Sequence, residues 1–252
     1  MLVIGVPIGI SLGLGVIGAL WWSGESMMFF TQKLFNNFDS FPLLAIPFFL
    51  LSGDIMARGT LADTLLNFCR SMLGHRKAGM AYITIVTCLF YGALCGSAAA
   101  TTAAVGATMI PAMEREGYPK SFSTAVNAAS GSLGIIIPPS IPMILYGAFG
   151  GVSIADMFIA GIVPGCFVAL MLMITAGFIC QKNGYGNILP KASAKERWDS
   201  FREAKWALGV PVIILGGIYG GITTPTEAGV VAVVYSFIVE KFIRKSLTMA
   251  VF

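Results

Sequence analysis

Charged side chains are scarce in this sequence of 252 residues. Asp, Glu, Lys and Arg together make up 11% of the chain, against about 25% in a typical soluble domain. Histidine occurs once, and the cysteines lack the CxxC spacing of metal or redox sites; they are Cys69, Cys88, Cys95, Cys166 and Cys180. The composition therefore argues against a soluble domain, and we interpret the cysteines as small buried hydrophobic residues rather than metal ligands or disulfide partners.

Long apolar segments make up most of the chain instead. Hydrophobic residues account for 56% of it, and the mean hydropathy is +0.83. A membrane-spanning helix needs about 20 apolar residues. Apolar segments run roughly over 2–22, 41–57, 78–95, 97–113, 121–149, 154–181, 206–222 and 226–240. We predict an all-α membrane protein with about six transmembrane helices, and we expect segment 2–22 to be retained as a span because it lacks a basic flank and a clear cleavage site.

The basic residues are distributed unevenly among the loops, which predicts the orientation. Only Lys33 lies in the loops on one side of the membrane. The other loops carry Arg58, Arg70, Arg76, Lys77, Arg115, Lys120, Lys182, Lys191, Lys195, Arg197, Arg202, Lys205, Lys241, Arg244 and Lys245. The positive-inside rule places this second set, and the N-terminus, in the cytoplasm. The net charge of +4 is thus a topology signal and not a sign of nucleic-acid binding.

Two polar interruptions occur inside apolar segments. The first, Gly96-Ser97-Ala98-Ala99-Ala100-Thr101-Thr102, lies at the centre of 78–113. Both ends of 78–113 are cytoplasmic, so it is either two full spans or a re-entrant hairpin, and the absence of charged or aromatic anchors at its centre favours the hairpin. The second, Ser130-Gly131-Ser132-Leu133-Gly134 followed by Pro138-Pro139-Ser140, predicts a broken helix within 121–149. Simple kinking of packed helices is the alternative for both.

The segments that contain these interruptions carry no Asp, Glu, Lys, Arg or His. Intramembrane proteases and proton relays need such groups, so we expect neither enzymatic activity nor proton coupling. Hydroxyl and carbonyl oxygens suit a hard cation such as Na⁺. Helix C-termini at the breaks would face the cation, and the N-termini of 98–113 and of the half-helix after Pro139 would face an organic anion.

Several polar residues have simpler structural interpretations. Thr224-Pro225-Thr226-Glu227 fits a helix capping box, and Asp54 and Arg58 fit an i,i+4 pair on one helix. His75 lies in a loop without an evident partner, so we do not assign it a metal or a proton. Segments 25–38, 61–73 and 194–206 have the pattern of amphipathic helices that lie along the membrane, although the third fits an ordinary solvated helix equally well.

Both interruptions, together with other stretches, resemble the large membrane subunit of tripartite ATP-independent periplasmic (TRAP) transporters, the DctM family. The matching stretches are residues 96–106, 136–142, 158–165 and 220–228, along with 40–53. One departure concerns Cys95, which stands where the family often has serine. A second is length, since members of the family are considerably longer, so we expect this chain to be the N-terminal part of a member.

The resemblance implies a fold of two inverted repeats and Na⁺-coupled import of organic acids, such as C4-dicarboxylates, by an elevator mechanism in the bacterial inner membrane. It implies two partners, a small four-helix membrane subunit and a periplasmic substrate-binding protein, and no cofactor apart from Na⁺ as the coupling ion. A related two-repeat Na⁺/carboxylate symporter without a binding protein is the alternative. Carried over, the ion-binding residues are Gly96, Ser97, Ser130, Gly131 and Ser132, and the residues near the substrate are Thr101, Thr102, Pro139 and Ser140.

The expected organisation has four parts. Residues 1–77 supply scaffold and interfacial helices. Residues 78–181 form a transport unit, with the hairpin at 78–113, the broken helix at 121–149 and a span at 154–181. Residues 182–205 form a cytoplasmic amphipathic connector, and residues 206–252 begin the second repeat.

Overall fold

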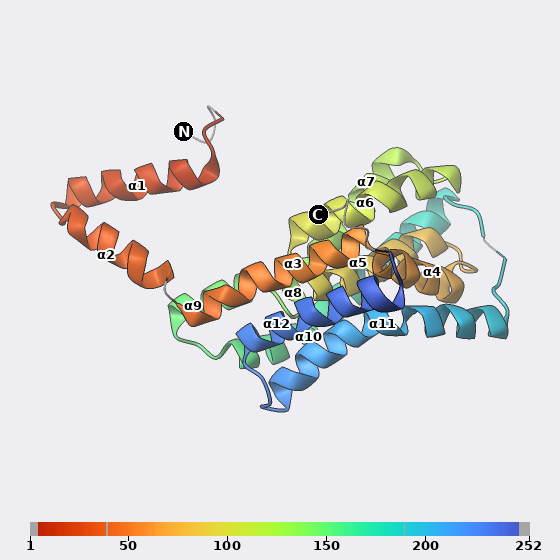
Figure 1. Ribbon diagram of the computed structural model, residues 1–252. Helices are drawn as coiled ribbons and strands as arrows, with labels where there is room; N and C mark the ends of the chain where they lie inside the picture. The colour runs from red at the N-terminus through yellow and green to blue at the C-terminus, as the bar shows by residue number, and fades with distance from the viewer. Residues whose placement is uncertain (1–4, 39, 189, 247–252) are drawn as a thin grey trace. The chain divides into compact units, whose positions relative to one another are not determined.

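A computed structural model of the chain describes residues 5–38, 40–188 and 190–246 (Figure 1). The described residues form helices joined by loops, and no strand occurs among them. They divide into two compact units, Met1–Phe41 and Pro42–Phe252, which are described separately below. The all-α fold predicted from the apolar segments is confirmed.

The first unit contains two helices. Helix α1 spans Ile8–Ser23 and helix α2 spans Met27–Phe38. Gly24, directly after α1, ends the helix in the left-handed conformation, with a φ of 72° that glycine tolerates best. Helix α2 lies within segment 25–38, which was predicted to form an amphipathic helix.

One group of helices in the second unit packs around a buried aromatic and aliphatic core. After the short turn η2 (Phe41–Leu44), the group comprises α3 (Ala45–Arg58), α4 (Leu61–Leu73), α11 (Ala194–Tyr219) and α12 (Pro225–Ile238), the last extended by the π-turn η3 (Val239–Ile243). Helix α3 packs on α12, and α4 packs on α11 (Figure 1). Fully buried side chains at this contact include Phe49, Met56, Leu61 and Ile214.

A second group surrounds α5 (Gly79–Cys95). It comprises α6 (Ala98–Arg115), α7 (Lys120–Gly131), α8 (Leu133–Ile136), α9 (Ile141–Gly150) and α10 (Ile154–Asn183). Helix α5 contacts α6, α7, α8 and α10, and also α4 of the first group. Its core includes Ile83, Ile85, Met109 and Leu133. The predicted hairpin and broken helix thus belong to one packed cluster.

Three helical segments in the described part of the chain are long and apolar enough to cross a membrane. They are Phe41–Arg58, Lys120–Gly150 and Ile154–Asn183, and Gly9–Ser23 and Gly79–Cys95 are shorter apolar helices. This result supports a membrane protein, while the total of about six spans stays a prediction. The division of the chain into scaffold, transport unit and connector also stays a prediction.

Local predictions from the sequence were accurate in several places. Thr224 and Glu227 form a capping box at the start of α12, and the side chain of Arg58 lies 2.8 Å from that of Asp54. Four of the cysteines are buried as predicted, but the prediction is wrong for Cys166, which is exposed. The sequence was expected to pass from an amphipathic segment, 194–206, into a separate span. The structure instead has one continuous helix, α11, which passes through Pro211.

A buried carboxylate joins the end of α12 to the start of α4. Glu240, in η3, is fully buried, and its side chain accepts a hydrogen bond of 2.8 Å from the backbone N–H of Leu61. It also accepts hydrogen bonds from the hydroxyls of Thr60, at 3.3 Å, and Ser246. The first N–H groups of a helix lack intrahelical partners, so Glu240 caps α4 from a distant part of the chain.

Candidate functional site at the hairpin tip and the helix break

The hairpin turns within two residues. Helix α5 ends at Cys95, Gly96 follows it with a φ of 65° in the left-handed region, and Ser97 is extended. The Ser97 hydroxyl accepts a hydrogen bond of 3.4 Å from the backbone N–H of Ala100, so it caps the N-terminus of α6. The tip therefore brings the carbonyl end of one helix and the N–H end of another together across two residues.

The helix break lies between α8 and α9. Helix α7 ends at Gly131, Ser132 forms a turn, and α8 ends at Ile136. The chain is then non-helical until Ser140, whose hydroxyl donates to the carbonyl oxygen of Ile135 at 2.7 Å. The Ser140 hydroxyl oxygen also accepts a hydrogen bond of 3.5 Å from the backbone N–H of Met143, so Ser140 caps α9. The predicted broken helix is present, and its wider interruption is the Pro138-Pro139 stretch.

The hairpin tip packs directly on the helix break. The backbone N–H of Ile141 donates to the carbonyl oxygen of Gly96 at 3.1 Å. A Cβ atom added to Gly96 would lie 2.8 Å from the carbonyl oxygen of Pro139. The two interruptions, far apart in the sequence, therefore meet backbone to backbone, and glycine is the residue that permits this approach.

Two further glycines bring α6 against the broken helix. A Cβ atom on Gly134 would lie 2.6 Å from the hydroxyl oxygen of Thr101 and 2.8 Å from the carbonyl oxygen of Ser97. A Cβ atom on Gly131 would overlap the hydroxyl of Thr102. The structure thus brings together six residues that the family resemblance assigns to the ion or substrate site: Gly96, Ser97, Thr101, Thr102, Gly131 and Pro139.

Two hydroxyl groups at this site donate hydrogen bonds to carbonyl oxygens of their own helical segments. Thr102 donates to the carbonyl oxygen of Ala98 at 2.8 Å, and Ser132 donates to that of Ala129 at 2.7 Å. The Thr101 oxygen lies 3.3 Å from the Cys95 sulfur, so the thiol at the position where the resemblance suggests serine still contacts a hydroxyl. A hydroxyl that donates to a carbonyl keeps oxygen lone pairs available, and lone pairs are what a cation needs.

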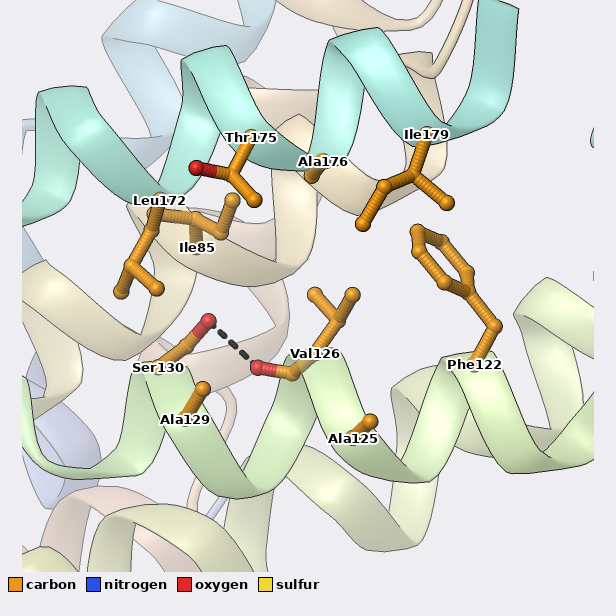
Figure 2. A pocket seen from close by; sticks show the side chains of 10 residues that line it. All are labelled: Ile85, Phe122, Ala125, Val126, Ala129, Ser130, Leu172, Thr175, Ala176 and Ile179. Carbon is orange, nitrogen blue, oxygen red and sulfur yellow. Dashed lines mark hydrogen bonds between the residues drawn. The ribbon is translucent and has the colours of Figure 1, made fainter. Parts of the chain in front are cut away.

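Ser130 faces a different part of the cluster from the tip. It lines a cavity of about 180 Å³ between α5, α7 and α10, and its hydroxyl donates to the carbonyl oxygen of Val126 at 2.6 Å (Figure 2). Most of the cavity wall is apolar, with Thr175 as the other hydroxyl-bearing side chain. Figure 2 shows Ser130 and Thr175 on facing helices. Ser130 is thus adjacent in sequence to Gly131 but lines the cavity that α10 closes.

Sequence analysis missed Asn127, which links the two interruptions. This side chain is buried on α7, and its Nδ2 donates to the carbonyl oxygen of Thr102 at 2.9 Å. A Cβ atom on Gly106 would overlap the Asn127 amide, so α6 approaches α7 closely there. A polar amide one helical turn before Ser130, inside an apolar segment, is the sequence signal that could have identified it.

The site offers neutral oxygen ligands and helix ends rather than charged groups. Neither the tip, 92–106, nor the broken helix, 121–149, contains Asp, Glu, Lys, Arg or His. Within the described residues, no group of three or more His, Cys, Asp or Glu is placed to hold a metal ion. Such an arrangement suits binding of a weakly held cation and an organic anion at opposite helix ends.

The whole sequence, residues 1–252, matches the family described as the tripartite ATP-independent periplasmic transporter, DctM component. The chain belongs to this DctM family. Its membership agrees with the resemblance carried by the tip, the break and the other matching stretches. DctM relatives are transporter permeases, so the family also supports a role other than catalysis.

Characterised relatives align over nearly all of the chain. The isethionate TRAP transporter permease protein DctMQ of Oleidesulfovibrio alaskensis is 44% identical over 252 residues, which is 100% of this chain and 40% of the relative. The C4-dicarboxylate TRAP transporter large permease protein DctM of Vibrio cholerae is 44% identical over 98% of this chain and 55% of the relative. The ectoine TRAP transporter large permease protein TeaC of Halomonas elongata is 40% identical over 99% of this chain and 59% of the relative.

These relatives differ in the substrates that their names give, although the aligned region is similar in each. The chain spans about half the length of the relatives it matches, between 40% and 59% for these three. Activity, substrate and partners of a whole permease are therefore matters for proposal.

Proposed function

We propose that this chain is part of the large permease subunit of a TRAP transporter that imports organic acids, in particular carboxylates, together with Na⁺. The transporter works in the bacterial inner membrane, with the N-terminus of this chain in the cytoplasm. Its partners are a small four-helix membrane subunit and a periplasmic substrate-binding protein. Family membership and the names of the relatives support this proposal.

The observation that carries the proposal is the contact between Gly96 and Ile141. It places the end of α5, which carries partial negative charge, beside the start of α9, which carries partial positive charge. Secondary transporters bind ions and substrates at such helix ends. A cation at the tip and an anion at the start of α9 would also attract one another, which favours binding of both together.

We assign the ion to the oxygens around Gly96, Ser97, Gly131 and Ser132, with Na⁺ as the coupling ion. Ser130, which the family resemblance also placed at the ion site, faces the cavity closed by α10 and is left out of the proposed ligand set. Neutral hydroxyl and carbonyl oxygens match its preference as a hard cation. We place Thr101, Thr102, Pro139 and Ser140 beside the organic anion, near the capped N-termini of α6 and α9. In this proposal the tip and the break move through the membrane as one elevator unit, because backbone contacts join them.

Reconstituted transport tests the proposal. The permease that contains this chain is placed in liposomes with its small subunit, and a C4-dicarboxylate is supplied on the binding protein. We expect uptake against a concentration gradient when Na⁺ is high outside, and loss of uptake when an ionophore dissipates the Na⁺ gradient. Equal uptake driven by a K⁺ gradient would exclude Na⁺ coupling, and equal uptake without the binding protein would favour a simple symporter.

A further inference from the structure

A surface hollow opens where the loop between α4 and α5 meets the end of α10. Its volume is about 390 Å³, and it is lined by His75, Arg76, Lys77, Tyr82 and Gln181. None of these lining residues is acidic. The hollow therefore combines two full positive charges with an imidazole, a phenol and an amide that can donate hydrogen bonds.

Two nitrogen-bearing groups near the hollow lack partners. Nδ1 of His75 is buried, as are Nε and Nη2 of Arg197, and no hydrogen-bond partner reaches them within the described chain. A buried polar atom without a partner is costly. An acceptor-rich anion in the hollow would give His75 Nδ1 a partner.

The charges around His75 also favour an anion in the hollow. Partial desolvation lowers the pKa of His75, and the positive charges of Arg197, Lys191 and Arg76 lower it further. The nearby ion pair of Arg70 with Glu116, at 3.9 Å, involves none of these cations. Helix α5 begins beside the loop without a side-chain cap, which adds the positive end of its dipole.

An exposed apolar face of α10 leads to the same hollow. Ile174 and Phe178 are 56% and 68% exposed, and Gln181, which lines the hollow, follows them at helical spacing on the same face. Helix α10 is the most apolar of the three candidate spans. An acyl chain could lie along this face while its head group occupies the hollow.

We propose that this hollow binds the phosphate of an anionic phospholipid such as phosphatidylglycerol, with Arg76 and Lys77 pairing with the phosphate and His75 and Gln181 hydrogen-bonding to the head group. Basic pockets between spans at the cytoplasmic surface are suited to such head groups. The site is separate from the hairpin tip, so this inference goes beyond the proposed transport function. Inorganic phosphate shares the same recognition chemistry and serves as the comparison ligand.

Lipid retention tests the site with a matched pair of variants. The permease that contains this chain is purified in mild detergent, and retained phosphatidylglycerol and phosphatidylcholine are counted by native mass spectrometry. In the double variant Arg76→Gln/Lys77→Gln we expect about 10- to 30-fold weaker phosphatidylglycerol binding, as for the loss of two cations at a membrane surface. The control Arg115→Gln/Lys120→Gln removes two exposed basic residues outside the hollow. It should bind phosphatidylglycerol as strongly as the parent permease.

Imidazole NMR of His75 gives a second readout. His75 is the one histidine in these 252 residues, and a His75→Gln variant assigns its ¹⁵N signals. Short-chain phosphatidylglycerol should raise the pKa of His75, because an anion offsets the neighbouring cations, whereas short-chain phosphatidylcholine should not. Equal loss of lipid in both double variants would overturn the proposal in favour of diffuse surface attraction. Inorganic phosphate acting on His75 as strongly as phosphatidylglycerol would overturn the lipid assignment.

Discussion

The backbone N–H of Ile141 donates a hydrogen bond of 3.1 Å to the carbonyl oxygen of Gly96. This bond joins the tip of a helical hairpin to the first residue of the helix that follows the break. It uses only backbone atoms, so no side-chain substitution other than proline removes the donor or the acceptor. In the proposed mechanism this bond couples a cation at the tip to an anion at the start of α9.

Substitution of Gly96 should disrupt this contact specifically. In Gly96→Ala the new methyl group would lie 2.8 Å from the Pro139 carbonyl oxygen, in addition to the cost of a left-handed alanine, which is about 1–2 kcal/mol. Gly184→Ala is the matched control, because Gly184 has a φ of 68° and also ends a helix but has open space around it. We expect uptake to be lost only in Gly96→Ala, and both variants to be less thermostable. Equal uptake in the two variants would mean that the tip tolerates separation from the break.

Removal of the Asn127 amide should loosen α6 from α7. Asn127→Ala removes the side-chain donor to the Thr102 carbonyl oxygen, which keeps only the hydrogen bond from its own helix, and this loss of one buried hydrogen bond should cost about 0.5–1.5 kcal/mol of stability. Thermal unfolding in detergent measures this loss. Ser123→Ala on the same helix is the control, because the Ser123 hydroxyl donates to the carbonyl oxygen of Pro119, next to the start of its own helix, at 3.1 Å. A melting temperature of Asn127→Ala no lower than that of Ser123→Ala would contradict a linking role for the amide.

Glu240 should stabilise the junction between α4 and α12. Glu240→Ala would leave the backbone N–H of Leu61 and the Thr60 hydroxyl without their acceptor, and we expect a loss of about 1–3 kcal/mol in the free energy of unfolding. Glu240→Gln keeps a carbonyl oxygen as acceptor and should lose less. Glu203→Ala, which removes an exposed acid on α11, controls for charge. If the three variants have the same melting temperature, the Glu240 carboxylate does not cap α4.

Orientation can be read by cysteine labelling. In a background where the exposed Cys166 is replaced by serine, Lys195→Cys should react with a membrane-impermeant maleimide only from the cytoplasmic side. Thr31→Cys, in α2, should react only from the outside, because the connection that contains it belongs to the set that carries Lys33 alone. Reversed labelling at both positions would invert the proposed topology.

Features encoded by local sequence were predicted well. The capping residues Thr224 and Glu227, the Asp54–Arg58 pair and the bounds of α4 follow from short-range rules of spacing and hydrogen bonding. The glycine and serine at the hairpin tip were likewise identifiable, because a turn between two apolar helices needs residues that tolerate unusual backbone angles. The structure places that turn at Gly96 and Ser97.

Contacts between distant segments could not be predicted in the same way. The bond between Gly96 and Ile141 uses backbone atoms, and the approach of Gly131 to Thr102 depends on glycine having no side chain. Neither contact leaves a pattern of hydrophobicity in the sequence. Capping of α4 by Glu240 depends on the packing of helices that are far apart in the sequence. Helix α11 runs without a break from the charged segment 194–206 into the apolar segment that follows, because a change in side-chain polarity does not itself interrupt the backbone hydrogen bonds of a helix.

The Na⁺ dependence of a capping variant tests the central claim, that the tip binds the coupling ion, most directly. Ser97→Ala and Ser153→Ala each remove a serine N-cap that accepts a hydrogen bond from the third residue of its helix, at 3.4 and 3.3 Å. Their effects on helix stability should therefore be similar, about 1 kcal/mol, but only Ser97 lies at the tip. We predict that Ser97→Ala raises the Na⁺ concentration for half-maximal uptake about tenfold, as for loss of one oxygen ligand, and that Ser153→Ala leaves it unchanged. The same half-maximal Na⁺ concentration in both variants and the parent protein would contradict the account.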